Sequence, residues 1–355
     1  MKRPPHGGEA AQGGPIRLDF SVNLNTTAPP IPRALWQRWQ EAIRVYPPPT
    51  GREVEAHIAR FLNADPAGVL ATNGGNEALR IALETSGGAR LLVPSPCFAE
   101  YPYFAQQIGM PWSEKRLPPE DWGKARAWLP DPVEDETVIM LANPNNPAGF
   151  LLPRDELAAA IQASVARGTR WIVDEAFVDF VPGGRENSLV PLLGELPNLA
   201  VADSFTKAWA IPGLRLGFLA TAHPAWMQTA RKEQITWPLH GLALPWVAHY
   251  LQPEEVAQME ASLAAFHSWR AYAQDALQTS TSLRPLPSTC NYFLVETPPG
   301  TSANALADAL ESQGILVRRC DAIPGMPPDR FVRLAVLPPE ATDQLVAALK
   351  PLVPR

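Results

Sequence analysis

Between residues 68 and 221, short apolar runs alternate with longer stretches of helical periodicity. The apolar runs read GVLAT, ARLLVPSP, TVIMLANP, TRWIVDEAF, NLAVADS and RLGFLAT. The amphipathic stretches NEALRIALE, AEYPYFAQQIG and RDELAAAIQASVARG separate the first four of these runs. Strands buried on both faces of a sheet are continuously apolar, and crossover helices connect strands that run parallel. The pattern therefore predicts an α/β fold with helices on both faces of a mainly parallel sheet.

The pattern changes on both sides of this region. Residues 1–31 are irregular and rich in Gly and Pro. Apolar spacing predicts helices at residues 33–43, 52–63, 224–236, 245–280 and 302–313. Strands are expected at NYFLVE, ILVRR and FVRLAV, so the C-terminal part has an α+β composition. We therefore predict an N-terminal arm with part of a small domain (1–43), a large domain (44–235) and a small C-terminal domain (236–355).

Composition excludes several classes of protein. The net charge is -6 and no basic run stands out, which argues against a nucleic-acid or anionic-membrane partner. Cys97, Cys290 and Cys320 are scattered without metal-ligand spacing, so we expect reduced thiols and no metal site. No run approaches the ~20 apolar residues that span a bilayer, and no apolar stretch follows the N-terminal charges. We expect a cytoplasmic protein without a signal peptide.

Polar and aromatic residues follow the predicted strands at the ends where ligands collect in open α/β sheets. In TNGGNEAL, Gly75 and Asn76 present backbone N–H groups at a helix start, which attracts phosphate. In PSPCFAEY, the ring of Phe98 could stack on a flat cofactor. A glycine turn before a helix is usually only a turn, and an aromatic residue after a strand is more often part of the core. Neither motif identifies a site by itself.

Three further motifs are more specific. In LANPNNPAG, Asn146 is held by the following Pro147 at a strand end. Asp174 in IVDEAF ends an apolar strand, where a carboxylate needs a cation such as a pyridinium nitrogen, although a helix cap or a salt bridge would also satisfy it.

The stretch DSFTKAWAIPGLRLGF combines hydroxyls, an amine and a guanidinium. Ser204, Thr206 and Arg215 suit a phosphate, and Lys207 is an amine suited to a Schiff base. A lone lysine is ordinarily solvated. The order of these features along one fold instead favours an anion site with a reactive amine in it.

The succession of these motifs resembles the fold-type I pyridoxal-phosphate enzymes, in the class I/II aminotransferase branch. The resemblance covers nearly the whole chain, from DFSVNLNTTAPP to FVRLAV. It implies pyridoxal 5'-phosphate as cofactor and a large domain with a mainly parallel seven-stranded sheet between helices, beside a smaller α+β domain. HGG, DEAF and TKAWAIPGLRLGF are most similar to the threonine-phosphate decarboxylases of cobalamin synthesis, with the histidinol-phosphate aminotransferases next.

The resemblance also implies a role for each cofactor-binding residue. Lys207 would carry the cofactor as a Schiff base, and Asp174 would keep its ring nitrogen protonated. The residues that would hold the cofactor phosphate are Gly75, Asn76, Ser204, Thr206 and Arg215. Phe98 would stack on the ring, and Asn146 would bond the ring hydroxyl oxygen. Tyr46 in VYPPPTG would reach the phosphate of a neighbouring subunit, which implies a homodimer.

Substrate-binding residues follow from the same resemblance. Arg333 would bind the substrate carboxylate with Asn146 beside it, while Arg318 and His6 match substrate-binding residues of the decarboxylases. Arg319 adjoins Arg318, so the sequence leaves open which of the two faces the pocket. Phe177 stands where many relatives have a tyrosine hydroxyl, and the loss of that hydroxyl changes the basicity of the cofactor-bound amine.

The reaction itself has two alternatives at this point. A bond at the substrate α-carbon breaks readily only when it stands perpendicular to the cofactor ring, so orientation selects decarboxylation or transamination. A non-catalytic pyridoxal-phosphate module, as in fused transcription regulators, would need a DNA-binding domain for which the N-terminus has no room. A nucleotide-binding Rossmann protein is excluded because no G-x-G-x-x-G follows the first strand.

Overall fold

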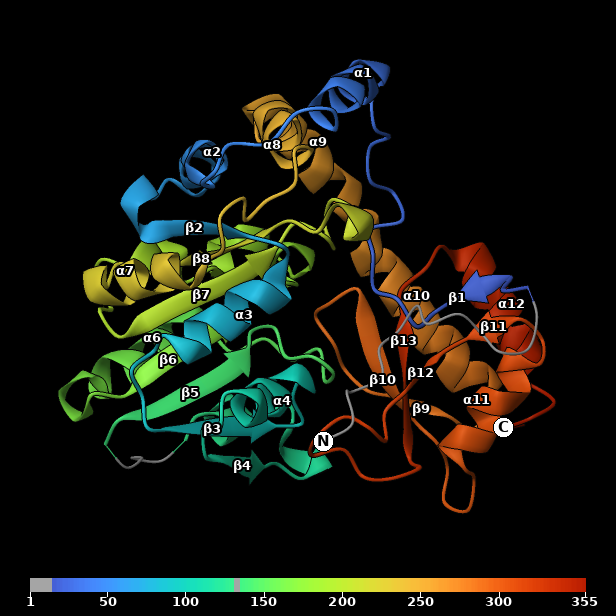
Figure 1. Cartoon of the computed structure of the whole chain (residues 1–355). Helices are drawn as coiled ribbons and strands as arrows, with labels where there is room; N and C mark the ends of the chain where they lie inside the picture. The colour runs from blue at the N-terminus through green and yellow to red at the C-terminus, as the bar shows by residue number, and fades with distance from the viewer. Residues whose placement is uncertain (1–14, 131–134) are drawn as a thin grey trace.

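The computed structural model describes residues 15–130 and 135–355, and a seven-stranded central sheet organises the chain (Figure 1). Its strands are β2 (Val69–Thr72), β3 (Arg90–Ser95), β4 (Trp112–Arg116), β5 (Thr137–Ala142), β6 (Arg170–Asp174), β7 (Leu199–Ser204) and β8 (Gly217–Ala220). They lie in the order β2-β8-β7-β6-β5-β3-β4, and only β8 runs antiparallel to its neighbours. The predicted α/β class and the mainly parallel sheet are confirmed.

Helices cover both faces of the central sheet because alternate residues of each strand point to opposite sides. Side chains such as Val93 and Met140 pack in one core with helices α3 (Gly75–Glu84), α4 (Glu100–Gln107) and α7 (Pro224–Glu233). Neighbours such as Leu141 and Val173 join the other core, which includes side chains of α2 (Arg52–Leu62) and α6 (Arg154–Ala163). The continuous apolar runs are thus explained by burial on two faces.

A second, antiparallel sheet lies beside the first, and we call it the C-terminal sheet. Its order is β12 (Arg318–Arg319), β13 (Phe331–Ala335), β10 (Tyr292–Glu296) and β9 (Arg284–Pro285). Its companion helices are α10 (Ala265–Ser280), α11 (Ala303–Glu311) and α12 (Pro339–Leu349). Near the N-terminus, β1 (Leu18–Asp19) pairs in parallel with β11 (Ile315–Leu316). The start of the described chain therefore packs with its last quarter (Figure 1).

Helices near the top of Figure 1 connect the two sheets. Helix α8 (Ala243–Tyr250) packs against α1 (Arg33–Ala42) and α2, and α9 (Pro253–Leu263) precedes α10. The helices expected near residues 245–280 are α8, α9 and α10, and Pro253, which has no N–H to continue α8, starts α9. Strand β4 was not predicted, since its sequence WSEKR is half exposed and lacks an apolar run. The domain bounds at residues 43 and 235 stay predictions.

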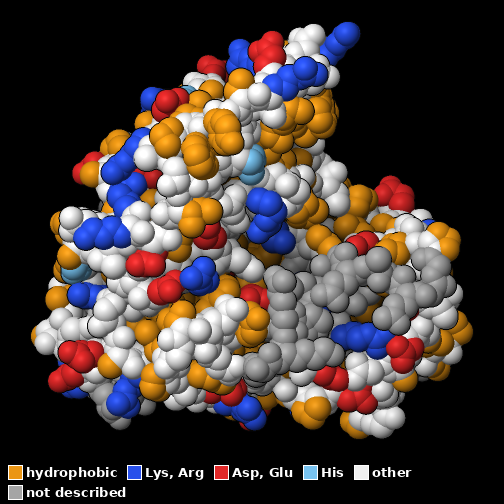
Figure 2. Space-filling view, in the orientation of Figure 1, with side chains coloured by type: hydrophobic (Ala, Val, Ile, Leu, Met, Phe, Trp, Pro, Cys, Tyr) orange, Lys and Arg blue, Asp and Glu red, His pale blue; other side chains and the backbone are white. Residues whose placement is uncertain are grey.

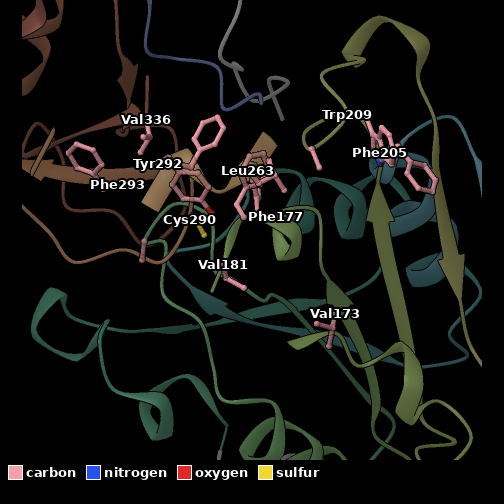
Figure 3. Packing of buried hydrophobic residues seen from close by; sticks show 14 of the residues in the cluster. Val173, Phe177, Val181, Phe205, Trp209, Leu263, Cys290, Tyr292, Phe293 and Val336 are labelled. Atoms are coloured by element: carbon pink, nitrogen blue, oxygen red, sulfur yellow. The ribbon is translucent and has the colours of Figure 1, made fainter. Parts of the chain in front are cut away.

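One hydrophobic core continues from the central sheet into the C-terminal sheet (Figure 3). Phe177 follows β6 and Tyr292 begins β10, and their rings meet edge to face with centroids 4.9 Å apart. This contact ties the end of β6 to the strands that carry the arginines of the C-terminal sheet. Across the described residues, no helix combines the length and the apolarity needed to cross a membrane.

Candidate active site

A cavity of about 340 Å³ lies where the carboxyl ends of β6 and β7 face the C-terminal sheet. Parallel strands end at the same edge of a sheet, so residues distant in sequence meet there. The predicted site residues that line the cavity are Gly75, Asn76, Phe98, Asn146, Asp174, Ser204, Thr206, Lys207, Arg215, Arg318 and Arg333. Among the predicted residues that the structure describes, all but Tyr46 are thus brought together.

Tyr46 and His6 need separate mention. The side chain of Tyr46 is 83 % exposed, and its ring lies 5.0 Å from that of Trp237, away from the cavity of its own chain. His6 lies outside the described residues. Tyr46 therefore does not line the cavity of its own chain, and its action across a subunit interface stays a prediction.

The first corner of the cavity is an anion site made of backbone and hydroxyls. Ser204 Oγ and Thr206 Oγ1 lie 2.7 Å apart, and the N–H of Thr206 donates to Ser204 Oγ at 3.2 Å. Helix α3 begins at Gly75, so its free N–H groups and positive dipole end point toward this corner. The helix start packs tightly on the hydroxyls, since a Cβ on Gly75 would lie 3.3 Å from Ser204 Cβ.

Arg215 completes this corner and requires glycine beside it. Gly74 has a φ of +81°, and a Cβ there would lie 2.7 Å from Arg215 Nη2. The guanidinium donates to the carbonyl of Pro212 at 3.2 Å and to that of Asn73 at 3.4 Å, which fixes its position. Hydroxyls, helix N–H groups and a fixed guanidinium form a donor set that matches a phosphate.

Lys207 follows this corner and carries an unusual amine. Burial lowers the pKa of Lys207 to about 8, and the positive charges of Arg333 and Arg215 act in the same direction, while Asp174 opposes them. The amine lies 5.9 Å from the centre of the Phe177 ring. A neutral amine is the nucleophilic form, so the site prepares Lys207 for attack on a carbonyl at neutral pH.

Asp174 ends β6 at the floor of the cavity. Its carboxylate accepts a hydrogen bond from Tyr101 Oη at 2.8 Å and another from the N–H of Ala176 at 3.0 Å. Burial raises the pKa of Asp174, whereas these two hydrogen bonds and the charge of Lys207 oppose the shift. The result is a buried carboxylate held in one orientation, which favours a cationic partner.

Arg333 and Arg318 form the wall opposite the strand ends. The two residues are directly paired between β13 and β12, so their side chains lie on the same face of the C-terminal sheet. Arg333 Nη1 donates to Asn146 Oδ1 at 2.5 Å, and its Nη2 donates to the carbonyl of Ser21 at 3.3 Å. Arg333 Nε is buried without a hydrogen-bond partner among the described residues. An anion entering the cavity therefore meets two guanidinium groups.

The register also separates Arg318 from its neighbour. Arg319 is paired with Val332 and points to the opposite face, where its Nη2 bonds Asp308 Oδ1 at 2.6 Å and Glu311 Oε2 at 3.0 Å. Arg318 lines the cavity, and Arg319 does not.

Several residues of the site were missed by sequence reasoning. Tyr101 lies three residues after Phe98, and their rings contact edge to face at 5.7 Å. Asn23 lines the cavity and buries an amide oxygen that has no hydrogen-bond partner among the described residues. Asn25 bonds the carbonyls of Lys207 and Ala208, at 3.0 and 2.8 Å, and so holds the lysine loop. The polar pair in SVNLN was the available signal, since a core segment seldom carries two asparagines.

Comparison with known proteins identifies the family. The family model of class I and II aminotransferases matches residues 16–349. The chain belongs to this family. It is 30 % identical to threonine-phosphate decarboxylase of Salmonella typhimurium over 338 residues, which cover 94 % of the chain and 90 % of that protein. It is 28 % identical to histidinol-phosphate aminotransferase of Aeromonas hydrophila over 316 residues, with 86 % and 84 % covered.

Solved structures agree with the family in fold. A histidinol-phosphate aminotransferase from Clostridium acetobutylicum has a TM-score of 0.82 at 25 % identity and covers 94 % of this chain and 98 % of its own. L-threonine-O-3-phosphate decarboxylase from Porphyromonas gingivalis has a TM-score of 0.80 at 24 % identity, with 93 % and 99 % covered. The chain thus has the aspartate aminotransferase-like fold.

Class I and II aminotransferases depend on pyridoxal 5'-phosphate, and the residues of this cavity fit that group. The glycines at positions 74 and 75 leave open the space that a Cβ would fill beside Arg215 and Ser204. A phosphate needs such an open corner with donors around it. At the other end, the buried carboxylate of Asp174 provides the charge that a protonated pyridine nitrogen requires.

Proposed function

We propose that the anion corner of the cavity holds the phosphate of pyridoxal 5'-phosphate and that Lys207 binds its aldehyde. Ser204, Thr206 and Arg215 would donate to the phosphate together with the N–H groups of Gly75 and Asn76. Phe98, Asn146 and Asp174 would contact the ring. The adjacency of the hydroxyl pair, the helix start and the fixed guanidinium supports this assignment.

The chain's own residues divide the work of the reaction. When bound, the cofactor withdraws electrons from a breaking bond at the substrate α-carbon, and Asp174 maintains the ring charge that this requires. Lys207 is well suited to carry a proton to or from that carbon, because a pKa of about 8 lies close to neutral pH. Arg333 orients the substrate through its carboxylate, and Asn146 holds Arg333 in place.

We infer that the substrate is a small amino acid with a phosphate group, and that the reaction is decarboxylation of threonine phosphate to aminopropanol phosphate. The observation that carries this proposal is the direct pairing of Arg318 with Arg333 on the cavity face. Two guanidinium groups on one face of a cavity attract anionic ligands. A phosphorylated amino acid supplies one anion to each guanidinium. We propose that the protein catalyses this decarboxylation in cobalamin synthesis.

Amino-group transfer from histidinol phosphate to 2-oxoglutarate is the second candidate. The hydrogen bond between Arg333 and Asn146 favours it, because it draws the carboxylate-binding guanidinium toward a residue proposed to lie at the cofactor ring. A carboxylate held near the ring plane leaves the α-proton upright, and the proton then departs in place of carbon dioxide.

Product analysis distinguishes the two reactions. Purified enzyme is supplied with threonine phosphate alone, or with histidinol phosphate and 2-oxoglutarate, and carbon dioxide and glutamate are measured. We expect carbon dioxide from threonine phosphate. Glutamate without carbon dioxide would refute the decarboxylase proposal, and activity indifferent to the phosphate group would refute both reactions.

We also propose a homodimer in which Tyr46 reaches the phosphate site of the partner subunit. Exposed apolar side chains support an interface here: Trp36, Ile43, Val45, Tyr46, Ile235 and Trp237 are 47–83 % exposed. Figure 2 shows apolar side chains gathered at the top of the molecule, around α1 and α2. Sedimentation should give the mass of a dimer for the wild type and that of a monomer for Val45→Asp. A wild type that sediments as a monomer would exclude the interface.

A further inference from the structure

A cluster of buried charges lies behind the Ser204–Thr206 turn and does not line the cavity. Its centre is Arg185, in the short 3₁₀ helix Gly184–Asn187, and its partners are Asp179 and Asp203. Arg185 Nε lies 2.8 Å from Asp179 Oδ1, and Nη2 lies 2.9 Å from Asp203 Oδ2. The side chains of Arg185, Asp179 and Asp203 are 18 %, 7 % and 1 % exposed. Burying three charges is costly, so their arrangement needs a reason.

The segment that carries Arg185 is anchored next to the site. Glu175, which follows Asp174, accepts hydrogen bonds from Ser188 Oγ at 2.5 Å and from the N–H of Leu189 at 2.7 Å. Arg185 is therefore held from both sides, by Asp179 before it in the chain and by the Glu175 contacts after it. Its guanidinium has little freedom to leave Asp203.

Two routes of contact connect Arg185 with the Ser204–Thr206 turn. The first passes through Asp203, whose Oδ2 faces Arg185 while its Oδ1 accepts the N–H of Ser204 at 2.5 Å. The second passes through Phe61, since the guanidinium lies 4.8 Å above that ring, and the ring lies 6.0 Å from Phe205. Phe205 stands between the two hydroxyl residues of the turn. The first route ends on the backbone N–H of Ser204 and the second on the ring of Phe205, within the turn that carries these hydroxyls.

The charge of Arg185 also acts on the pKa of Asp203. Burial raises the pKa of Asp203, and Arg185 is the strongest influence that opposes this rise. Without the guanidinium, the pKa of Asp203 would rise further and its Oδ2 would lose its partner, so the side chain would be free to turn and disturb the hydrogen bond from the Ser204 N–H.

We propose that Arg185 is a positioning residue for the phosphate end of the cofactor, acting through Asp203 and Phe61 on the Ser204–Thr206 turn. The proposal rests on the assignment of that turn to the phosphate in the proposed function. Arg185 touches neither cofactor nor substrate, so its effect is confined to the part of the ligand that the turn binds.

Binding of two ligands that differ only in the phosphate tests this role. Cofactor-free wild type and the Arg185→Met variant are titrated with pyridoxal 5'-phosphate and with pyridoxal, and binding is followed by visible absorption. We expect Arg185→Met to lower the affinity for pyridoxal 5'-phosphate by about tenfold or more. Removal of the hydrogen bonds that support metal ligands lowers metal affinity by a similar factor. Pyridoxal affinity should change by less than about twofold.

Arg231→Met provides a matched control. Arg231 forms a buried ion pair with Glu55 at 2.8 Å, and its side chain is also 18 % exposed, but neither residue lines the cavity. This variant should lower the unfolding temperature about as much as Arg185→Met and leave both affinities unchanged. Arg185→Lys keeps the charge with fewer donors and should show a smaller loss that is again selective for the phosphate; it serves as the test if Arg185→Met does not fold.

The double variant Arg185→Met/Asp203→Asn should recover much of the lost affinity. Its amide oxygen still accepts the Ser204 N–H, and the buried charge of Asp203 is removed together with that of Arg185. Unchanged binding of pyridoxal 5'-phosphate in Arg185→Met, or equal weakening of both ligands, would overturn the positioning role. If the wild type itself binds pyridoxal as tightly as pyridoxal 5'-phosphate, the proposal that the Ser204–Thr206 turn binds the cofactor phosphate is refuted instead.

Discussion

The lowered pKa of Lys207 leads to a quantitative prediction for the cofactor-free protein. With a pKa of about 8, roughly a tenth of the amine is neutral at pH 7. A lysine at its ordinary value of 10.5 is only about 0.03 % neutral at that pH, so the site enriches the reactive form about 300-fold. The amine should therefore react with an acylating reagent at neutral pH, although burial restricts access to it.

Competitive acetylation measures this directly. Cofactor-free protein is labelled briefly with acetic anhydride at a series of values between about pH 6 and about pH 11, the range in which amines ordinarily titrate. It is then unfolded and fully labelled with the isotopically heavy reagent. Mass spectrometry of the peptide that contains Lys207 then gives its titration curve, and the exposed Lys232 corrects for reagent loss. We expect a midpoint near 8. Arg333→Met should move the midpoint up and Asp174→Asn should move it down, because the two charges have opposite signs.

The outcome that refutes this reasoning is a Lys207 midpoint at the ordinary lysine value in the cofactor-free protein. Movement of the midpoint in the same direction in Arg333→Met and Asp174→Asn would show that changed solvent access, not charge, controls the amine.

Further predictions concern stability, the floor of the cavity and its wall. Because the folded-state pKa of Lys207 lies below the unfolded value, the charged amine destabilises the fold below about pH 8, and the cost vanishes as pH rises to 10.5. Lys207→Met should thus raise the free energy of unfolding of cofactor-free protein at pH 7 by up to about 3 kcal/mol, and denaturant titrations at high pH should find no gain. Asp174→Ala should retain the cofactor by absorption, yet lose about 3–4 kcal/mol of transition-state stabilisation in kcat. Tyr101→Phe should raise the pKa of Asp174 and move the acidic limb of the kcat profile to higher pH, with unchanged cofactor content. Arg318→Met should raise KM for the phosphorylated substrate by about tenfold or more, whereas Arg319→Met should leave KM unchanged, since its partners are Asp308 and Glu311.

Local patterns in the chain determined most of the fold. Continuous apolar runs between amphipathic stretches predicted a parallel sheet covered on both faces, because burial on two sides leaves no polar position in a strand. The same reasoning missed β4, an edge strand with one side open to water, and placed no boundary at Pro253 between the helices of residues 245–280. Strands and helix breaks without a strong apolar pattern are set by packing, which the local sequence does not encode.

Short motifs likewise determined which residues line the cavity, since a strand end followed by polar residues is a local feature. Their order along the chain is enough to place Asp174, Ser204 and Lys207 at one edge, because parallel strands end together.

Only the tertiary structure decided which groups contact those residues and which charges lie near them. Strand register, not sequence, placed Arg318 opposite Arg333 and turned Arg319 toward α11, because a shift of one residue reverses the face of a side chain. The hydrogen bond from Tyr101 to Asp174 joins residues 73 positions apart, and the ion pair of Arg185 with Asp203 joins residues 18 positions apart. The pKa of Lys207 depends on such neighbours and on burial. Electrostatics acts through space, and distances in space are known only once the chain has folded.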